Sequence, residues 1–454
     1  MRVNRRGKNI SEFEQKNEPK NQRKNEQGIV ILLVAVFMLF VVGAMAALSI
    51  DVVTLYTARS EAQLAADAGA LAGARVLANS GMTSDPTLTA TAETGPFGAS
   101  LVAQWVATHN SVGGTRLNNA EVTVTFPATA PFSNPQITVQ IQVTDLPTFF
   151  SRIWGNQQLA VTATATAEAY NPSGAFAIGA GPPVAPLCVK PWLLPNIDPT
   201  QTNPAVPIFA ATGTAAAGLV GKSWPNATNP NGLFSACAGD CSLGISAPAA
   251  GQYYPGAIDA TDFPAPTALP SCAAGFNAYQ TAVAGCVQRP ISCGTASAIN
   301  PSAINIDQNP YAAGTRDSDT VQAVGCLIHY NVPGGVLGDA DSIDLFDTPS
   351  TPYEFWGGNQ NPIPSAQNQP ITVSDSLVTI PVIDNPPGTP ANPATVIGFL
   401  QVFLNPSALT TFPSAGNQIP VMIINAVGCA GTNLPSPILG NGASPVAVRL
   451  ITPP

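Results

Sequence analysis

Residues able to do catalytic chemistry are scarce in this chain of 454 residues. It holds only 2 histidines, His109 and His329, and neither lies at a metal-ligand spacing from other ligand types. The chain has no Gly-x-Ser-x-Gly nucleophile elbow and no glycine-rich phosphate-binding loop. His329 lies in the segment Cys326–Tyr330, which we predict to be a strand. We therefore predict no enzyme activity and no cofactor.

One acidic cluster has the residue types of a calcium site. Asp339, Asp341, Asp344 and Asp347 lie close together, and calcium takes oxygen ligands. Their spacing lacks the glycine at position 6 and the glutamate at position 12 of an EF-hand loop. A polar loop that leads into a strand is therefore the favoured interpretation, and we assign no metal.

The cysteines fit disulfide chemistry better than metal binding. Their number is even, and all 8 lie in the carboxyl-terminal two-thirds of the chain, which suits an oxidising compartment. We predict four disulfides, and short loops favour the pairs Cys237–Cys241 and Cys286–Cys293. The predicted disulfide residues are Cys188, Cys237, Cys241, Cys272, Cys286, Cys293, Cys326 and Cys429.

An apolar segment near the amino terminus predicts the cellular location of the chain. Residues 28–50 form 23 residues without a charge, which is enough for a membrane-spanning helix. Residues 1–27 carry 8 of the 17 Lys+Arg, so the amino terminus should remain cytoplasmic. The rest of the chain has 9 basic and 22 acidic residues, which excludes a basic surface for nucleic acid.

Two other interpretations of this segment are less favoured. A cleaved signal peptide would have a shorter apolar core, although Ala44-Met45-Ala46 resembles a cleavage site. A type IV prepilin leader would place a glutamate where this chain has Leu33. We therefore predict a retained anchor in a bacterial inner membrane, with the bulk of the chain periplasmic or extracellular.

The helical pattern continues beyond the membrane without a Gly/Pro stop and carries a family resemblance. Asp51, Tyr56, Arg59, Gln63 and the small-residue run 64–74 resemble the amino-terminal module of TadG-like proteins of the tight-adherence (Flp) pilus assembly group. The match departs at Ala62-Gln63, where the pattern reads Leu-Gln. The resemblance implies a structural role in pilus assembly, with pilus-assembly membrane proteins or pilin-like subunits as partners.

The same run has a physical interpretation of its own. Arg59, Gln63 and Asp67 recur every four residues, so they line one face of a helix. This face is either a solvated stripe or a device that docks the helix on a partner helix or on the chain's own sheet. Gly69 and Gly73 permit close backbone approach. We predict that partner contacts involve Asp51, Tyr56, Arg59, Gln63, Asp67, Gly69 and Gly73.

The remaining pattern predicts an α+β fold. Turn residues mark loops over 79–96, a short helix is expected over 98–110, and strands are expected over 121–126, 136–143 and 159–170. These elements predict a pilin-like module of a helix and an antiparallel sheet. A short helix or turn is expected over 146–155.

From residue 176 onward the chain is rich in proline and poor in charge, which predicts a loop-rich, disulfide-containing β region. Its predicted strands are 218–220, 377–383, 396–404, 419–427 and 446–451. The predicted divisions are a cytoplasmic tail (1–27), a transmembrane helix (28–50), a TadG-like module (51–175) and a β-rich region (176–454).

These observations predict a membrane-anchored structural component of a Flp (Tad) pilus or a related secretion system. Its action would depend on protein–protein contacts. The alternative is a membrane-anchored adhesin or glycan-binding protein, and an anchored hydrolase is the least favoured because histidines and paired catalytic motifs are so few.

Overall fold

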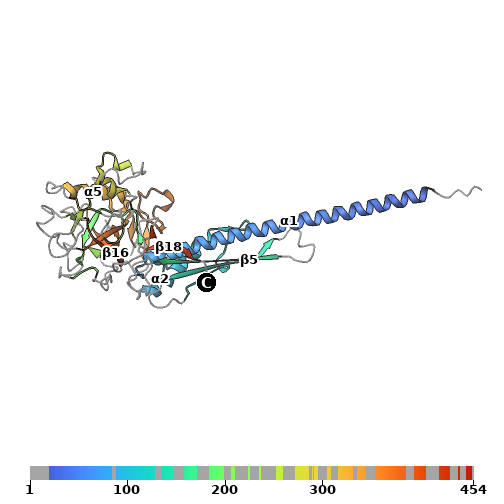
Figure 1. Cartoon of the computed structure of the whole chain (residues 1–454), viewed down its shortest axis with the longest axis horizontal. Coiled ribbons are helices and arrows are strands. Elements are labelled where there is room, and N and C mark those ends of the chain that lie inside the picture. The colour runs from blue at the N-terminus through green and yellow to red at the C-terminus, as the bar shows by residue number, and fades with distance from the viewer. Residues whose placement is uncertain are drawn as a thin grey trace, which may run out of the picture.

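The protein is described by a computed structural model, in which a single long helix leads into a folded body (Figure 1). The described residues are 20–83, 88–127, 134–147, 158–170, 184–198, 206–209, 223–224, 235–236, 252–258, 271–285, 289, 291–294, 304–307, 315–330, 335–343, 353–384, 393–404, 419–429, 438–439 and 446–451.

Helix α1 (Lys20–Asn79) is continuous over 60 residues and spans roughly 90 Å at ~1.5 Å per residue. Alanine, leucine and other helix formers dominate its sequence, and it contains no proline. The first half projects away from the body, and the second half packs within it (Figure 1). One helix therefore joins the apolar span to the folded module, as the sequence predicted.

The second half of α1 packs on helix α3 (Ala99–Thr108) and on an antiparallel sheet with the strand order β18-β5-β4-β3. Strands β3 (Val122–Thr125), β4 (Gln136–Pro147) and β5 (Gln158–Tyr170) confirm the three predicted strands. Strand β4 continues to Pro147, where a helix or turn had been expected, and residues 148–157 lie outside the described residues. Small additions are helix α2 (Thr89–Thr94), strands β1 (Ser111–Val112) and β2 (Thr115–Arg116), and the turn η2 (Asn119–Glu121). The expected loop 79–96 thus contains a short helix.

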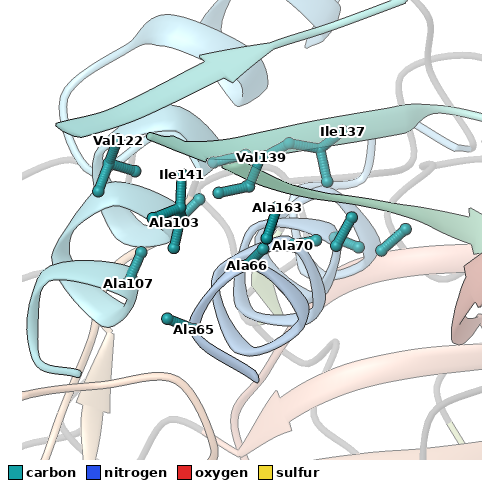
Figure 2. Close-up of a cluster of buried hydrophobic side chains, with 14 of the residues drawn as sticks. Ala65, Ala66, Ala70, Ala103, Ala107, Val122, Ile137, Val139, Ile141 and Ala163 are labelled. Atoms are coloured by element: carbon teal, nitrogen blue, oxygen red, sulfur yellow. The ribbon is translucent and has the colours of Figure 1, made fainter. Parts of the chain in front are cut away.

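The core of this module lies between the two helices and the sheet (Figure 2). Alternate residues of β4, such as Ile137, Val139 and Ile141, point toward the helices and are fully buried, while the intervening glutamine and threonine residues lie on the other face. The helices meet this apolar face with alanine side chains, among them Ala66, Ala70 and Ala103. Small residues let the helices approach the sheet closely.

Strand β18 (Ala447–Ile451) comes from the other end of the chain and completes this sheet beside β5. The strand was predicted from its apolar pattern, but it was assigned to the β-rich region and not to the module. Its Arg449 donates through Nε to Oε1 of the buried Glu168 at 2.6 Å. The chain between β5 and β18 is therefore an insertion in the module, and we call its described elements the head.

The head is built on a seven-stranded sheet with the order β8-β16-β15-β14-β7-β10-β9. Its centre is antiparallel, and all of its residues except the partly buried Ile397 are buried: β14 (Leu377–Ile383), β15 (Val396–Leu404) and β16 (Val421–Gly428). These strands confirm three predicted segments, and the predicted strand 218–220 lies outside the described residues. The flanking strands are β7 (Trp192–Pro195), β8 (Ser223–Trp224), β9 (Ser235–Ala236) and β10 (Gln252–Pro255).

Two helices in the head were not predicted. Helix α4 (Ala278–Ala284) and helix α5 (Thr315–Leu327) pack against each other and share an apolar core with the central strands. The predicted strand over Cys326–Tyr330 is wrong, because this segment closes α5. His329 has φ +60°, and the backbone N–H of Tyr330 bonds to the carbonyl of Gly325 at 2.7 Å, as in a Schellman motif.

Smaller elements complete the head. A three-stranded antiparallel sheet contains β11 (Ser342–Ile343), β12 (Phe355–Trp356) and β13 (Pro370–Ile371), and β6 (Val184–Ala185) pairs with β17 (Ile438–Leu439). Short 3₁₀ turns are η5 (Ser271–Ala273), η6 (Leu337–Asp339) and η7 (Pro364–Ala366).

Two disulfides connect distant parts of the head. Cys272 bonds to Cys326 and ties η5 to α5, and Cys293 bonds to Cys429 next to β16. The predicted Cys286–Cys293 pair is therefore wrong, because a short loop favours a pair only if the fold leaves both cysteines available. Cys188 is also disulfide-bonded. Cys237, Cys241 and Cys286 lie outside the described residues.

Candidate functional site

Helix α1 has an apolar segment that is suited to a membrane. Within the described residues it is the one helix that is long and apolar enough to cross a bilayer, and its most apolar part is not buried by the rest of the chain. Its side chains include Leu32, Phe37 and Leu39, all exposed. In water this surface would be costly, because large exposed apolar patches favour association or burial in lipid. The segment fits a single-pass membrane anchor.

Beyond this segment one face of α1 is buried by the protein's own core. Gly69 and Gly73 lie on that face, against α3 and β4. A methyl group added at Gly69 would lie 3.0 Å from the carbonyl oxygen of Ala103, and one at Gly73 would lie 3.1 Å from that of Ala99. The small-residue run therefore seats α1 within its own module, which was one of the two kinds of docking considered from the sequence.

The polar stripe of Arg59, Gln63 and Asp67 faces the sheet at one end and solvent at the other. Gln63 donates through Nε2 to Oδ1 of Asp67 at 2.8 Å and to the carbonyl oxygen of Thr164 on β5 at 3.2 Å. Gln63 and Asp67 are half-buried, whereas Arg59 is exposed. The stripe thus fixes the register of α1 on β5 at one end and leaves its amino-terminal residue accessible.

The other predicted contact residues also differ in burial. Asp51 is buried, and Tyr56 is exposed. Glu61, which was not predicted, accepts a hydrogen bond through Oε2 from the backbone N–H of Gly113 at 2.7 Å, in the turn between β1 and β2. Of the seven predicted partner-binding residues, Tyr56 and Arg59 therefore remain open to a second molecule.

An exposed apolar strip on α1 was missed by the sequence analysis. Val53, Leu64 and Leu71 project within about 20° of one direction at about 100° per residue, and all three are exposed. Tyr56 lies beside this strip. We call Val53, Tyr56, Leu64 and Leu71 the outer face of α1. Their spacing of 11 and 7 residues was visible in the sequence, but burial of the opposite face was needed to show that they point outward.

A buried polar network joins the end of α1 to the centre of the head. Asn425 on β16 donates through Nδ2 to the carbonyl oxygen of Ala78 and to Oε1 of Gln401 on β15, the latter at 2.6 Å. Gln401 approaches Oδ1 of Asn79 at 3.5 Å, and Thr83 donates to Oδ1 of Asn425 at 3.3 Å. Because these side chains are buried, their hydrogen bonds favour one seating of the head on α1.

The residues considered for catalysis or metal binding have local structural partners. Asp341 accepts hydrogen bonds from Gly358, Asn361 and Ser374, at distances of 2.6–2.9 Å. Nε2 of His329 lies 3.0 Å from Oδ2 of Asp375, and Nδ1 of His109 lies 2.7 Å from the carbonyl oxygen of Trp105. Within the described residues no three metal-ligating side chains gather, and Asp344 and Asp347 lie outside them.

Comparison with known proteins identifies the amino-terminal part of this fold. Residues 28–76, the apolar segment and the docked part of α1, match the Tad family model of TadE/G-like Flp pilus-assembly proteins. This match confirms the resemblance seen in the sequence for that segment. No curated protein and no solved structure matches the chain. Residues 28–76 are thus a TadE/G-like segment, and the head is inserted between β5 and β18 of the sheet on which the second half of α1 packs.

Proposed function

We propose that this protein is a membrane-anchored structural component of a bacterial Flp-type pilus or a related secretion system, and that it acts through protein–protein contacts. The TadE/G-like match over residues 28–76 supports the system. The basic residues before the apolar segment support a cytoplasmic amino terminus, with the module and head on the far side of the inner membrane.

The observation that carries the proposal is the outer face of α1. Val53, Leu64 and Leu71 continue the apolar surface of the membrane segment along the part of the helix that lies outside it. An apolar helix strip that its own chain leaves uncovered is a surface for another helix. The proposed partner is an apolar helix of a pilus-assembly membrane protein or a pilin-like subunit, with Tyr56 and Arg59 at the edge of the contact.

A substitution of Leu64 tests this proposal. Leu64 is 65 % exposed, so Leu64→Glu should leave the protein folded while placing a charge in the helix contact. Pilus assembly and recovery of partners after crosslinking should both fall at least tenfold. Val373→Glu is the matched control, because Val373 is 63 % exposed on the head. Normal assembly with Leu64→Glu, at wild-type protein levels, would contradict the role of this face.

A further inference from the structure

Helix α3 places its smallest side chains inside and its largest apolar side chains outside. Its three buried positions are Ala99, Ala103 and Ala107. The large apolar residues on and just before the helix that are exposed are Phe97, Leu101 and Trp105, which are 48, 53 and 61 % exposed. Large apolar side chains in one exposed row are unusual on a protein surface unless something binds there.

This exposed row forms one wall of a groove at the junction of the module and the head. Tyr353, which lies beside strand β12, and Ile371 on strand β13 line the same groove from the head. The groove has a volume of about 710 Å³, and most of its lining is apolar. A groove of this size and character suits the side chains of a bound segment.

A cation lies in this apolar groove. Arg75 lines it from α1, and its Nε is buried with no hydrogen-bond partner among the described residues. Loss of solvent lowers the pKa of the Arg75 guanidinium, although arginine remains charged near neutral pH. Glu354 also lines the groove, but it is buried and has interactions of its own. An incoming carboxylate would supply the missing partner of Arg75.

The backbone supports the same interpretation. Phe97 has φ +59°, a left-handed conformation that costs free energy for an aromatic residue. The strained residue lies at the end of the exposed row, directly before Gly98, the N-cap of α3. Strain of this kind often occurs at ligand-binding positions.

We propose that this groove binds a segment of another polypeptide that carries an apolar side chain next to a carboxylate. The apolar side chain would pack on Leu101 and Trp105, and the carboxylate would bind Arg75. A glycan is disfavoured, because sugars need many hydrogen bonds and the groove lining is mainly apolar. No residue of the outer face of α1 lines the groove, so the groove adds a second contact to the proposed function.

The test measures binding of short peptides to the full-length protein in lipid nanodiscs. Four labelled octapeptides differ only at two adjacent positions, with Phe or Ser followed by Asp or Asn, and binding is followed by fluorescence anisotropy. The Phe-Asp peptide should bind about tenfold more tightly than either the Phe-Asn or the Ser-Asp peptide. Equal affinities for all four peptides, or no saturable binding, would overturn the proposal.

Three variants assign the effect to the groove. Arg75→Gln should remove the preference for Asp over Asn, and Trp105→Ser should weaken both Phe peptides without changing the unfolding midpoint. Ile363→Ser is the control, because Ile363 is exposed on the head and does not line the groove. Wild-type binding by Trp105→Ser, or saturable binding of a neutral oligosaccharide in place of the peptides, would overturn the proposal.

The same assay separates this inference from the proposed function. Leu64 does not line the groove. Leu64→Glu should therefore bind the Phe-Asp peptide as the wild-type protein does, whatever its effect on pilus assembly. A loss of peptide binding in Leu64→Glu at normal stability would contradict a separate site.

Discussion

At the scale of single residues, the sequence alone leaves two roles open for Gly73. A small residue can seat its helix on a partner or on its own protein. In the structure Gly73 faces Ile137 and the backbone of Ala99, so there is no room for a side chain. Close packing of this kind makes added atoms costly. The residue therefore contributes to the stability of the module.

Gly73→Leu should destabilise the module by about 2–3 kcal/mol, because the leucine would force α1 away from α3 and β4. Urea unfolding of the full-length protein in detergent measures this change. Gly43→Leu is the control: Gly43 lies in the same helix with nothing within 4 Å of an added methyl group. Equal stability of the two variants would show that α1 does not pack through Gly73.

Lys190 illustrates a residue whose environment was invisible in the sequence. Its Nζ donates to the carbonyl oxygens of Val283 and Gly285, both at 2.7 Å, where helix α4 ends. Burial lowers the pKa of Lys190 to about 7, and the charge of Asp375 partly opposes this shift. The lysine is thus a buried cap for α4 that can lose its proton near neutral pH.

This pKa predicts a direction for stability against pH. An unfolded lysine keeps its proton up to about pH 10.4, so between about pH 7 and 10 the unfolded state binds more protons than the native state. The free energy of unfolding should therefore rise with pH in this window and be lowest below pH 7. Lys190→Met should remove that rise, as measured by urea unfolding at pH 6, 8 and 9.5.

The relevant quantity is the difference in the free energy of unfolding between the wild-type protein and Lys190→Met. The contributions of other titrating groups cancel in this difference. Tyr254 is one such group, since burial raises its pKa. A difference that stays constant from pH 6 to 9.5 would mean that Lys190 does not titrate in this range.

At the scale of elements, the sequence predicted regular segments well where one period dominated. Strands β4 and β5 have clean alternation, and α1 and α3 have no internal breaker. The strand predicted over Cys326–Tyr330 was wrong, because a run of five mixed apolar and polar residues is too short to distinguish a strand from the end of a helix. The pairing of β18 with β5 was not predicted, because a local pattern identifies a strand whereas tertiary contacts select its neighbour.

Only part of the candidate site could be predicted from the sequence. The resemblance seen in the sequence covered about residues 27–78, and the family model matches residues 28–76. The four-residue spacing located the stripe of Arg59, Gln63 and Asp67. Which side of α1 is free depends on the placement of α3 and the sheet, so the outer face required the structure. The groove beside α3 combines residues from the module and from the head, and no local signal connects them.

Strand β18 should contribute to the stability of the module through its pair with Glu168. Side chains of Arg449 and Glu168 meet at 2.6 Å, and Glu168 is buried. Arg449→Met should therefore destabilise the protein by about 1–3 kcal/mol, because the buried carboxylate loses its partner. Urea unfolding at pH 7 measures the loss, and the double variant Arg449→Met/Glu168→Gln should recover part of it. An unchanged unfolding midpoint in Arg449→Met would show that β18 is not held by this pair.

At the scale of the whole molecule, the insertion of the head between β5 and β18 gives it two connections to the module. Both connections belong to neighbouring strands of one sheet. The network around Asn425 adds a third attachment, from β15 and β16 to the end of α1. A head that is attached to the module at several points among the described residues should move together with α1, so contacts made by the head would be transmitted along that helix.

Asn425→Leu should loosen this attachment. The leucine has a similar volume but cannot donate to Ala78 or to Gln401, so two buried oxygen acceptors lose a partner. Spin labels on cysteines placed at the exposed positions Leu71 and Ile363 would report the distance between α1 and the head. The distance distribution should be narrow in the wild-type protein and broad in Asn425→Leu, whereas Asn359→Leu, an exposed position on the head, should keep it narrow. Equally narrow distributions in all three proteins would show that strand pairing alone holds the head in place.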